Sequence, residues 1–139
     1  MKDDEQNEIS FAEQEFRNWC DANDIDYAEE DMEEDDRKDF QKIKKRFLKA
    51  VNDKRLVIDG TTLKYTVSRF SKSVGQILTI TRPIGRDMIA MDGFKETMQM
   101  QKFHAFLASI AKTEKSFINN LDMLDRQFLQ DIGTLFLVS

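Results

Sequence analysis

The stretch "LTITRPIGRDMIAMDGFKETM", residues 78–98, marks the change from strand to helix in this chain. Its first residues alternate between apolar and polar, as in a β-strand, and this alternation stops at Thr81-Arg82-Pro83. Proline cannot donate a hydrogen bond to a sheet ladder, so Pro83 is expected to end the strand. A different pattern begins at Gly85-Arg86-Asp87, and a short helix over 85–91 is expected to stop at Asp92-Gly93. The stretch therefore predicts a sheet before it and helices after it.

The residues before this stretch predict the rest of the sheet. An apolar run, 56–58, and a run that alternates between apolar and polar residues, 63–67, flank the dipeptide Asp59-Gly60. This dipeptide favours a tight turn with positive φ. Residues 77–81 then supply a third strand. We expect a three-stranded antiparallel meander over about 55–81.

Helical periodicity fills most of the remaining chain. Ser10 and Glu13 fit a capping box that starts a short amphipathic helix. The expected helices cover residues 10–22, 37–53, 85–91, 95–111, 114–119 and 122–137. The predicted fold class is α+β, mostly helical, with the small meander packed against helices.

Charge is distributed unevenly along the chain, whose formal net charge is −5. Residues 1–36 carry sixteen acidic side chains against Lys2 and Arg17, a net charge of −14. Residues 37–86 carry a net charge of +11, and residues 87–139 a net charge of −2. We therefore expect an acidic N-terminal segment over 1–36, partly mobile around its short helix, and a single globular α+β domain over 37–139.

The composition favours a soluble protein of a reducing compartment. Cys20 is the only cysteine, so no disulfide within the chain can form. The chain has no run of ~20 apolar residues that would cross a membrane. The N-terminal residues "MKDDEQNE" lack the basic and apolar regions of a secretion signal. A cytoplasmic protein without a membrane partner is expected.

Catalytic and metal-binding patterns are weak in this sequence. The one histidine, His104, is 84 positions from Cys20, whereas a zinc site needs clustered ligands. The acidic run "DIDYAEEDMEED" has Glu29 where an EF-hand loop needs glycine. The five glycines are scattered and form no phosphate loop. We expect no metal, no cofactor and no enzymatic activity.

Asp87 and Asp125 invite a catalytic interpretation as a pair of carboxylates. Each lies near the start of an expected helix, where an anion is stabilised by roughly 0.3–1 kcal/mol. Helix capping is therefore favoured over catalysis for both residues.

The basic block 37–86 could bind nucleic acid through phosphate contacts. The adjacent segment with a net charge of −14 would repel phosphates, so pairing of the two blocks within the molecule or between copies is favoured. One alternative stays open, a small regulatory module that binds nucleic acid or a basic protein partner through the charged N-terminal third.

Methionines and aromatic residues are concentrated in the helical half of the chain. Methionine is flexible and suits both core filling and adaptable binding surfaces. The run "FKETMQMQKFHAFLASIAK" has more apolar residues than one helical stripe requires, and an exposed surplus would mark a partner contact. The candidate contact residues are Phe94, Met98, Met100 and Phe106.

Two segments, "LTITRPIGRDMIAMDG" and "SFINNLDMLDRQFLQDIGTLFLV", resemble the tail assembly chaperones of long-tailed bacteriophages and related prophage elements. Many members of that family have a strand, a variant of L-R-x-P-x-x-x-D-L, intervening helices and a last helix announced by a leucine and an aspartate. The matching positions here are Leu78 to Ile80, Arg82-Pro83, Asp87-Met88, Leu121, Asp125 and a face of Phe128, Ile132 and Phe136. The resemblance covers about residues 56–139, and the part before residue 54 departs from it.

The resemblance implies a protein that is not an enzyme. Such chaperones coat the long, aggregation-prone tape measure protein, keep it soluble and help tail-tube subunits to polymerise around it. They work in the host bacterial cytoplasm and leave before the virion is complete. The expected partners are the tape measure protein, with the tail-tube protein as a further candidate, and other copies of the chain.

Overall fold

The computed structural model describes residues 9–91 and 99–138. It is an α+β fold in which helices dominate and one small antiparallel sheet lies in the middle of the chain, which confirms the predicted fold class. The elements are α2 (Phe11–Ala22), the 3-10 helix η1 (Glu29–Asp31), α3 (Glu34–Asn52), β1 (Leu56–Asp59), β2 (Thr62–Thr66), β3 (Ile77–Ile80), α4 (Gly85–Ile89), α5 (Gln99–Ile110), α6 (Lys115–Asn119) and α7 (Met123–Val138).

The sheet has the strand order β1-β2-β3, as the meander prediction required. Gly60 supplies the positive φ of 62° in the β1–β2 turn, which is the conformation that an Asp-Gly turn favours. In the central strand Leu63 and Tyr65 are buried while Lys64 between them is exposed. β3 ends at Ile80, so Pro83 lies outside the strand as predicted.

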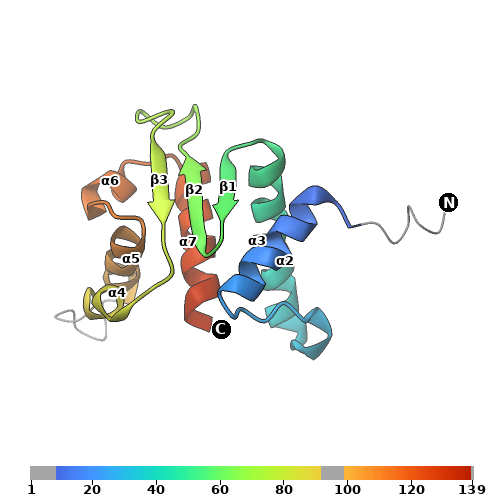
Figure 1. Cartoon of the computed structure of the whole chain (residues 1–139). Coiled ribbons are helices and arrows are strands. Elements are labelled where there is room, and N and C mark those ends of the chain that lie inside the picture. Colours follow the sequence, from blue (N-terminus) through green and yellow to red (C-terminus); the bar gives the residue numbers. More distant parts are fainter. Residues whose placement is uncertain (1–8, 92–98, 139) are drawn as a thin grey trace.

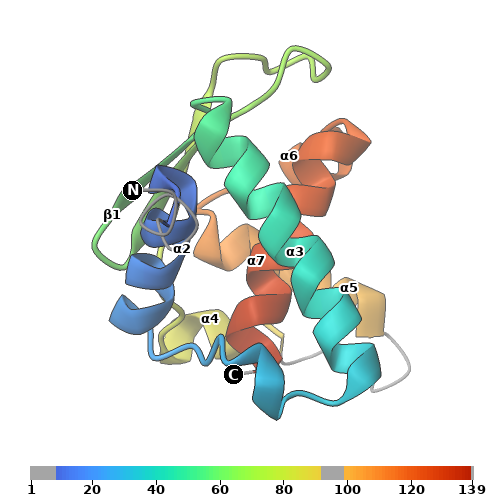
Figure 2. The ribbon, with the colours of Figure 1, turned by 90° about the vertical axis from the view of Figure 1, so that its right-hand side faces the viewer.

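Helix α7 covers the buried face of this sheet and runs behind β2 in Figure 1. The ring of Phe128 stacks on that of Tyr65, with centroids 4.3 Å apart and planes 10° from parallel. Leu129, Ile132 and Leu135 continue the buried stripe of α7. The opposite face of the sheet is exposed, and Figure 2 shows it on the side away from α7.

Helices α2 and α3 pack beside β1 and close the other side of the core (Figures 1 and 2). Phe16 meets the ring of Phe47 edge-on at 4.9 Å, and Trp19 lies 5.4 Å from Phe136 between ring centroids. The indole Nε1 of Trp19 also donates to the carbonyl oxygen of Thr61 at 3.3 Å.

The boundary that we expected near residue 36 therefore does not divide the hydrophobic core. Phe16, Trp19 and Ile25 belong to the same buried cluster as the side chains of α3, the sheet and α7. The amphipathic stripe of α2 is buried by packing on α3 and, through Trp19, on Phe136 of α7. The expected mobility of parts of the acidic segment stays a prediction.

Helix ends follow the sequence only in part. Ser10 caps α2, with its Oγ accepting a hydrogen bond from the Glu13 backbone N–H at 3.1 Å. The Glu13 side chain does not complete the capping box and instead pairs with Arg17 and Lys44. Over residues 9–91 and 99–138, no helix has the length and hydropathy needed to span a membrane.

Candidate functional site

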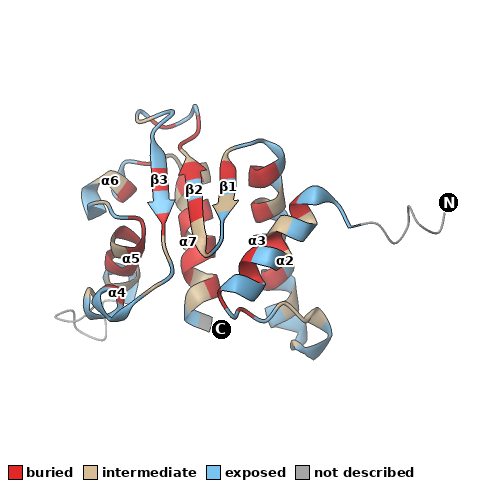
Figure 3. Cartoon of the chain, viewed as in Figure 1, coloured by how far each residue is buried: buried red, intermediate tan, exposed pale blue. Residues whose placement is uncertain are grey.

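Four exposed apolar side chains lie on α4, the residue before it and the first turn of α5. They are Ile84, Met88, Ile89 and Met100, and the last two are 65% and 70% exposed. Helix α4 packs against the C-terminal part of α5, where Ser109 meets Asp87 (Figures 1 and 3), and Met100 lies nine residues before Ser109, at the other end of α5. We call these four residues the α4–α5 apolar surface.

A buried carboxylate holds α4 against α5. Oδ2 of Asp87 accepts a hydrogen bond of 2.8 Å from the Ile84 N–H at the start of α4, and Oδ1 accepts one from the Ser109 hydroxyl on α5. Burial alone would raise the pKa of Asp87, but the hydrogen bonds from Ser109 and Ile84, with Lys112 and Arg86, hold it below its ordinary value. Asp87 therefore both caps α4, as predicted, and ties it to α5.

The four residues predicted to contact a partner have different outcomes in the structure. Met100 is exposed and forms part of the surface. Phe94 and Met98 lie outside the described residues. Phe106 is fully buried, so its assignment as a contact residue is corrected here to a core residue. The reason is that residues 105–108 are all buried, which shows that this half of α5 is enclosed on every side.

Ile84, Met88 and Ile89 are exposed but were not among the residues predicted to contact a partner. The available signal was the shortness of the helix between Pro83 and Gly93. A helix of five residues that buries Asp87 leaves its neighbouring apolar side chains outside.

A second buried carboxylate, Asp125, fixes the loop between β2 and β3. Its oxygens accept hydrogen bonds from the Tyr65 hydroxyl at 2.6 Å, the Ser68 N–H at 3.0 Å, the Ser68 hydroxyl at 2.8 Å and the Ser71 hydroxyl at 2.6 Å. Burial would raise the pKa of Asp125, but the hydrogen bonds from Ser71, Tyr65 and Ser68 keep it below its ordinary value. The carboxylate is structural.

The capping role predicted for Asp125 belongs instead to Asp122. Oδ2 of Asp122 accepts a hydrogen bond of 2.9 Å from the Leu124 N–H in the first turn of α7. Asp87 and Asp125 each have their own set of hydrogen-bond donors and do not form a pair of carboxylates.

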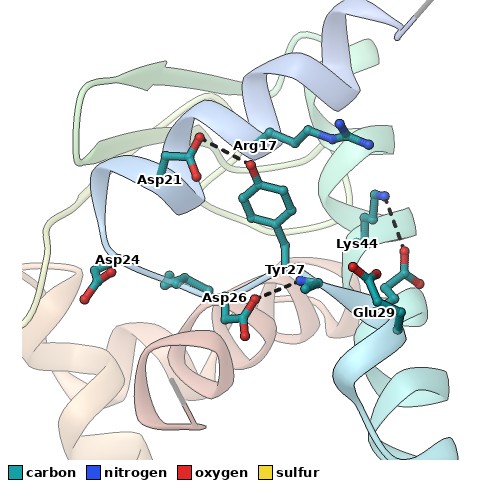
Figure 4. Close-up of a pocket in the computed structure, with 10 residues that line it drawn as sticks. Arg17, Asp21, Asp24, Asp26, Tyr27, Glu29 and Lys44 are labelled. Atoms are coloured by element: carbon teal, nitrogen blue, oxygen red, sulfur yellow. Dashed lines mark hydrogen bonds and ion pairs between the residues drawn. The ribbon is translucent and has the colours of Figure 1, made fainter. Parts of the chain in front are cut away.

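A hollow of about 630 Å³ lies between α2, residues 24–30 and α3 (Figure 4). Both of its basic side chains, Arg17 and Lys44, pair with carboxylates. Lys44 Nζ lies 2.9 Å from Glu13 and 3.8 Å from Glu29, and the Tyr27 hydroxyl donates to Asp21 at 3.3 Å. These pairs join the acidic segment to α3, in agreement with the expected neutralisation within the molecule.

The one cysteine and the one histidine both have pKa values shifted by burial. Burial, followed by the charge of Asp21, raises the pKa of the Cys20 thiol to about 12. Burial also lowers the pKa of His104, with Arg126 and Lys115 acting in the same direction. Within residues 9–91 and 99–138, no three His, Cys, Asp or Glu side chains are grouped so that they could hold a metal ion.

Comparison of the chain with known proteins found no matching family model, no matching curated protein and no matching solved structure.

Proposed function

We propose that the protein is a tail assembly chaperone of a long-tailed bacteriophage or prophage, acting in the host bacterial cytoplasm. In this proposal it binds the tape measure protein, keeps it soluble and assists polymerisation of the tail tube. The observation that supports it best is the α4–α5 apolar surface, which stays exposed on a helix pair fixed by the buried Asp87.

The chemistry of this surface suits a client with many apolar helices. Full burial of one large apolar side chain contributes about 1.5–3 kcal/mol. Met88 and Met100 add flexible thioether side chains, which adapt to different apolar contacts along a long client. The strand, Arg82-Pro83 and Asp87 that carry the family resemblance lead directly into this surface.

Binding to nucleic acid has less support. Several basic side chains of α3 are already engaged, Lys44 by Glu13 and Glu29, and Arg46 by two contacts with Asp131 at 2.6 and 2.9 Å. Fewer free cations remain to neutralise phosphates, so the full chain is expected to bind duplex DNA weakly even at low salt.

Co-expression with fragments of a tape measure protein tests the proposal. The wild-type chain is expected to raise the soluble fraction of the client and to co-purify with it. The triple variant Met88→Lys, Ile89→Lys, Met100→Lys is expected to lose both effects, because lysine keeps the length of these side chains but does not leave water.

A matched control is the double variant Phe11→Lys, Met123→Lys, which changes two exposed apolar side chains on other helices. It is expected to behave as the wild type. A wild-type chain that neither solubilises nor retains the client, or a triple variant as active as the control, would contradict the proposal.

A further inference from the structure

An apolar groove with an acidic rim lies at the end of the molecule where α7 finishes. It has a volume of about 410 Å³ and is formed by residues 25–32, α3 and the last turns of α7. Its apolar part consists of Ile25, Met32, Phe40, Ile43 and Leu135. Pockets of roughly 300–1,000 Å³ hold drug-sized ligands, so the groove has room for an aromatic side chain.

Three carboxylates, from Asp26, Asp36 and Asp39, stand around this groove. Asp36 and Asp39 are exposed, and no Lys or Arg among the described residues forms an ion pair with either. Residues 24–39 contain ten acids against Arg37 and Lys38, a net charge of −8. We call this site the acidic groove, and its charge favours a cationic segment with an apolar side chain.

The loop between β2 and β3 has these properties. Phe70 and Val74 are 59% and 57% exposed at its tip. Arg69 and Lys72 flank Phe70, and the sequence from Thr66 to Ile77 contains no acidic residue. The Arg69 guanidinium lies 4.9 Å from the centroid of the Phe70 ring. The loop tip thus presents an aromatic side chain between two cations.

The loop is also held in one shape before any contact is made. The hydroxyls of Ser68 and Ser71 donate to the buried Asp125, and Gly75 N–H donates to the Val67 carbonyl at 3.0 Å. Gly75 takes a positive φ of 85° that closes the turn. A pre-shaped loop loses little conformational entropy on docking.

The acidic groove and the loop lie at opposite ends of the molecule. Figures 1 and 2 show the β2–β3 loop at the top and the segment that leads into α3 at the bottom. The loop therefore does not reach the groove of its own chain, and the complementary surface belongs to a second copy.

We propose that residues 69–74 of one copy dock into the acidic groove of the next. Phe70 enters the apolar part, and Arg69 and Lys72 face the carboxylates of Asp36 and Asp39. Such a head-to-tail contact uses two different surfaces, so it forms a ring if the rotation closes and an open filament if it does not. It is separate from the α4–α5 apolar surface and can form without a client.

Sedimentation of the full-length chain, over a wide concentration range at low and high salt, tests this contact. The average mass is expected to rise with concentration and to fall with salt, because the ion pairs are exposed to solvent. A loop variant, Phe70→Asp, and a groove variant, Asp36→Lys with Asp39→Lys, are each expected to weaken association by at least about tenfold.

Matched controls carry the same changes outside the two surfaces. Phe11→Asp is the control for the loop variant. Glu34→Lys with Asp35→Lys is the control for the groove variant and alters the same turn of α3. Both controls are expected to associate as the wild type. Circular dichroism and urea unfolding establish that all four variants are folded.

Mixing the loop variant with the groove variant gives the sharpest result. Each has one intact surface, so the mixture is expected to form a one-to-one dimer and nothing larger, while each variant alone stays monomeric. A monomeric wild type, unchanged association of either variant alone, or a mixture that contains only monomers would overturn the proposal.

Discussion

The Tyr65 hydroxyl donates a 2.6 Å hydrogen bond to Oδ1 of Asp125, a residue 60 positions further along the chain. The same hydroxyl accepts a 2.8 Å hydrogen bond from Arg55. Through this contact the central strand, the β2–β3 loop and the first turn of α7 share one buried polar centre. The loop proposed to dock between copies is therefore coupled to the core of the fold.

Replacing Asp125 by asparagine is expected to destabilise the protein by about 3 kcal/mol, because hydrogen bonds to a charged group contribute more than neutral ones. The new amide nitrogen cannot accept from Ser68 or Ser71, so buried hydroxyls lose their partner. Urea unfolding measures the change. The exposed Glu30→Gln is the control and is expected to leave the midpoint unchanged; an equally small effect of Asp125→Asn would refute the structural role.

Acid is expected to unfold the protein through the same carboxylate. Asp125 and Asp87 have lowered pKa values in the fold, so their stabilising effect is complete above the unfolded value of about 3.9. It is lost as the pH falls through their folded pKa values. Stability measured from neutral pH downwards should stay level and then fall below about pH 4. Asp125→Asn should show a shallower fall; an unchanged slope would argue against this origin.

Cys20 is expected to be unreactive in the folded protein at pH 8. Its thiol is fully buried and its pKa is raised to about 12, so very little thiolate is present. Labelling with iodoacetamide, followed by mass spectrometry, should be slow in buffer and rapid in concentrated urea. Equal rates in both conditions would show that α2 does not stay docked.

Trp19→Ala is expected to destabilise the whole chain by roughly 3–5 kcal/mol, the usual cost of removing a large buried aromatic side chain. Since Trp19 packs on Phe47 and Phe136, the loss should appear in one cooperative transition and not in a separate event of the N-terminal segment. Phe11→Ala removes an exposed ring from the same helix and is the control. Two separate transitions would instead support a boundary near residue 36.

Gly133→Ala tests the close approach of α7 to α5. An added Cβ would lie 2.5 Å from Leu107 Cδ2 and 3.0 Å from Phe103 Cε1, and overpacking of this kind costs about 1–3 kcal/mol. Gly85→Ala is the control, because beyond its chain neighbours and its own helix backbone no atom lies within 4 Å of the added Cβ. Thermal unfolding should therefore separate the two variants, and equal stability would mean that α5 can move away freely.

The sequence by itself determined the order of the elements and the turns between them. Asp59-Gly60 marked the hairpin and Pro83 lay beyond the last strand, because turn conformations and lost backbone donors are local properties. Helical periodicity likewise predicted the helices over 10–22, 37–53 and 122–137, which correspond to α2, α3 and α7.

Only the tertiary structure decided which apolar and acidic residues are accessible. Phe106 looked like a surface residue in its own helix, and packing on neighbouring elements enclosed it, while Met100 on the same helix stayed exposed. Asp125 looked like a helix cap, and a loop more than fifty positions away supplied its donors. Likewise, α2 looked separate until it packed on α3. Burial and hydrogen bonding depend on segments that are distant in the chain, and the local pattern of one segment does not contain that information.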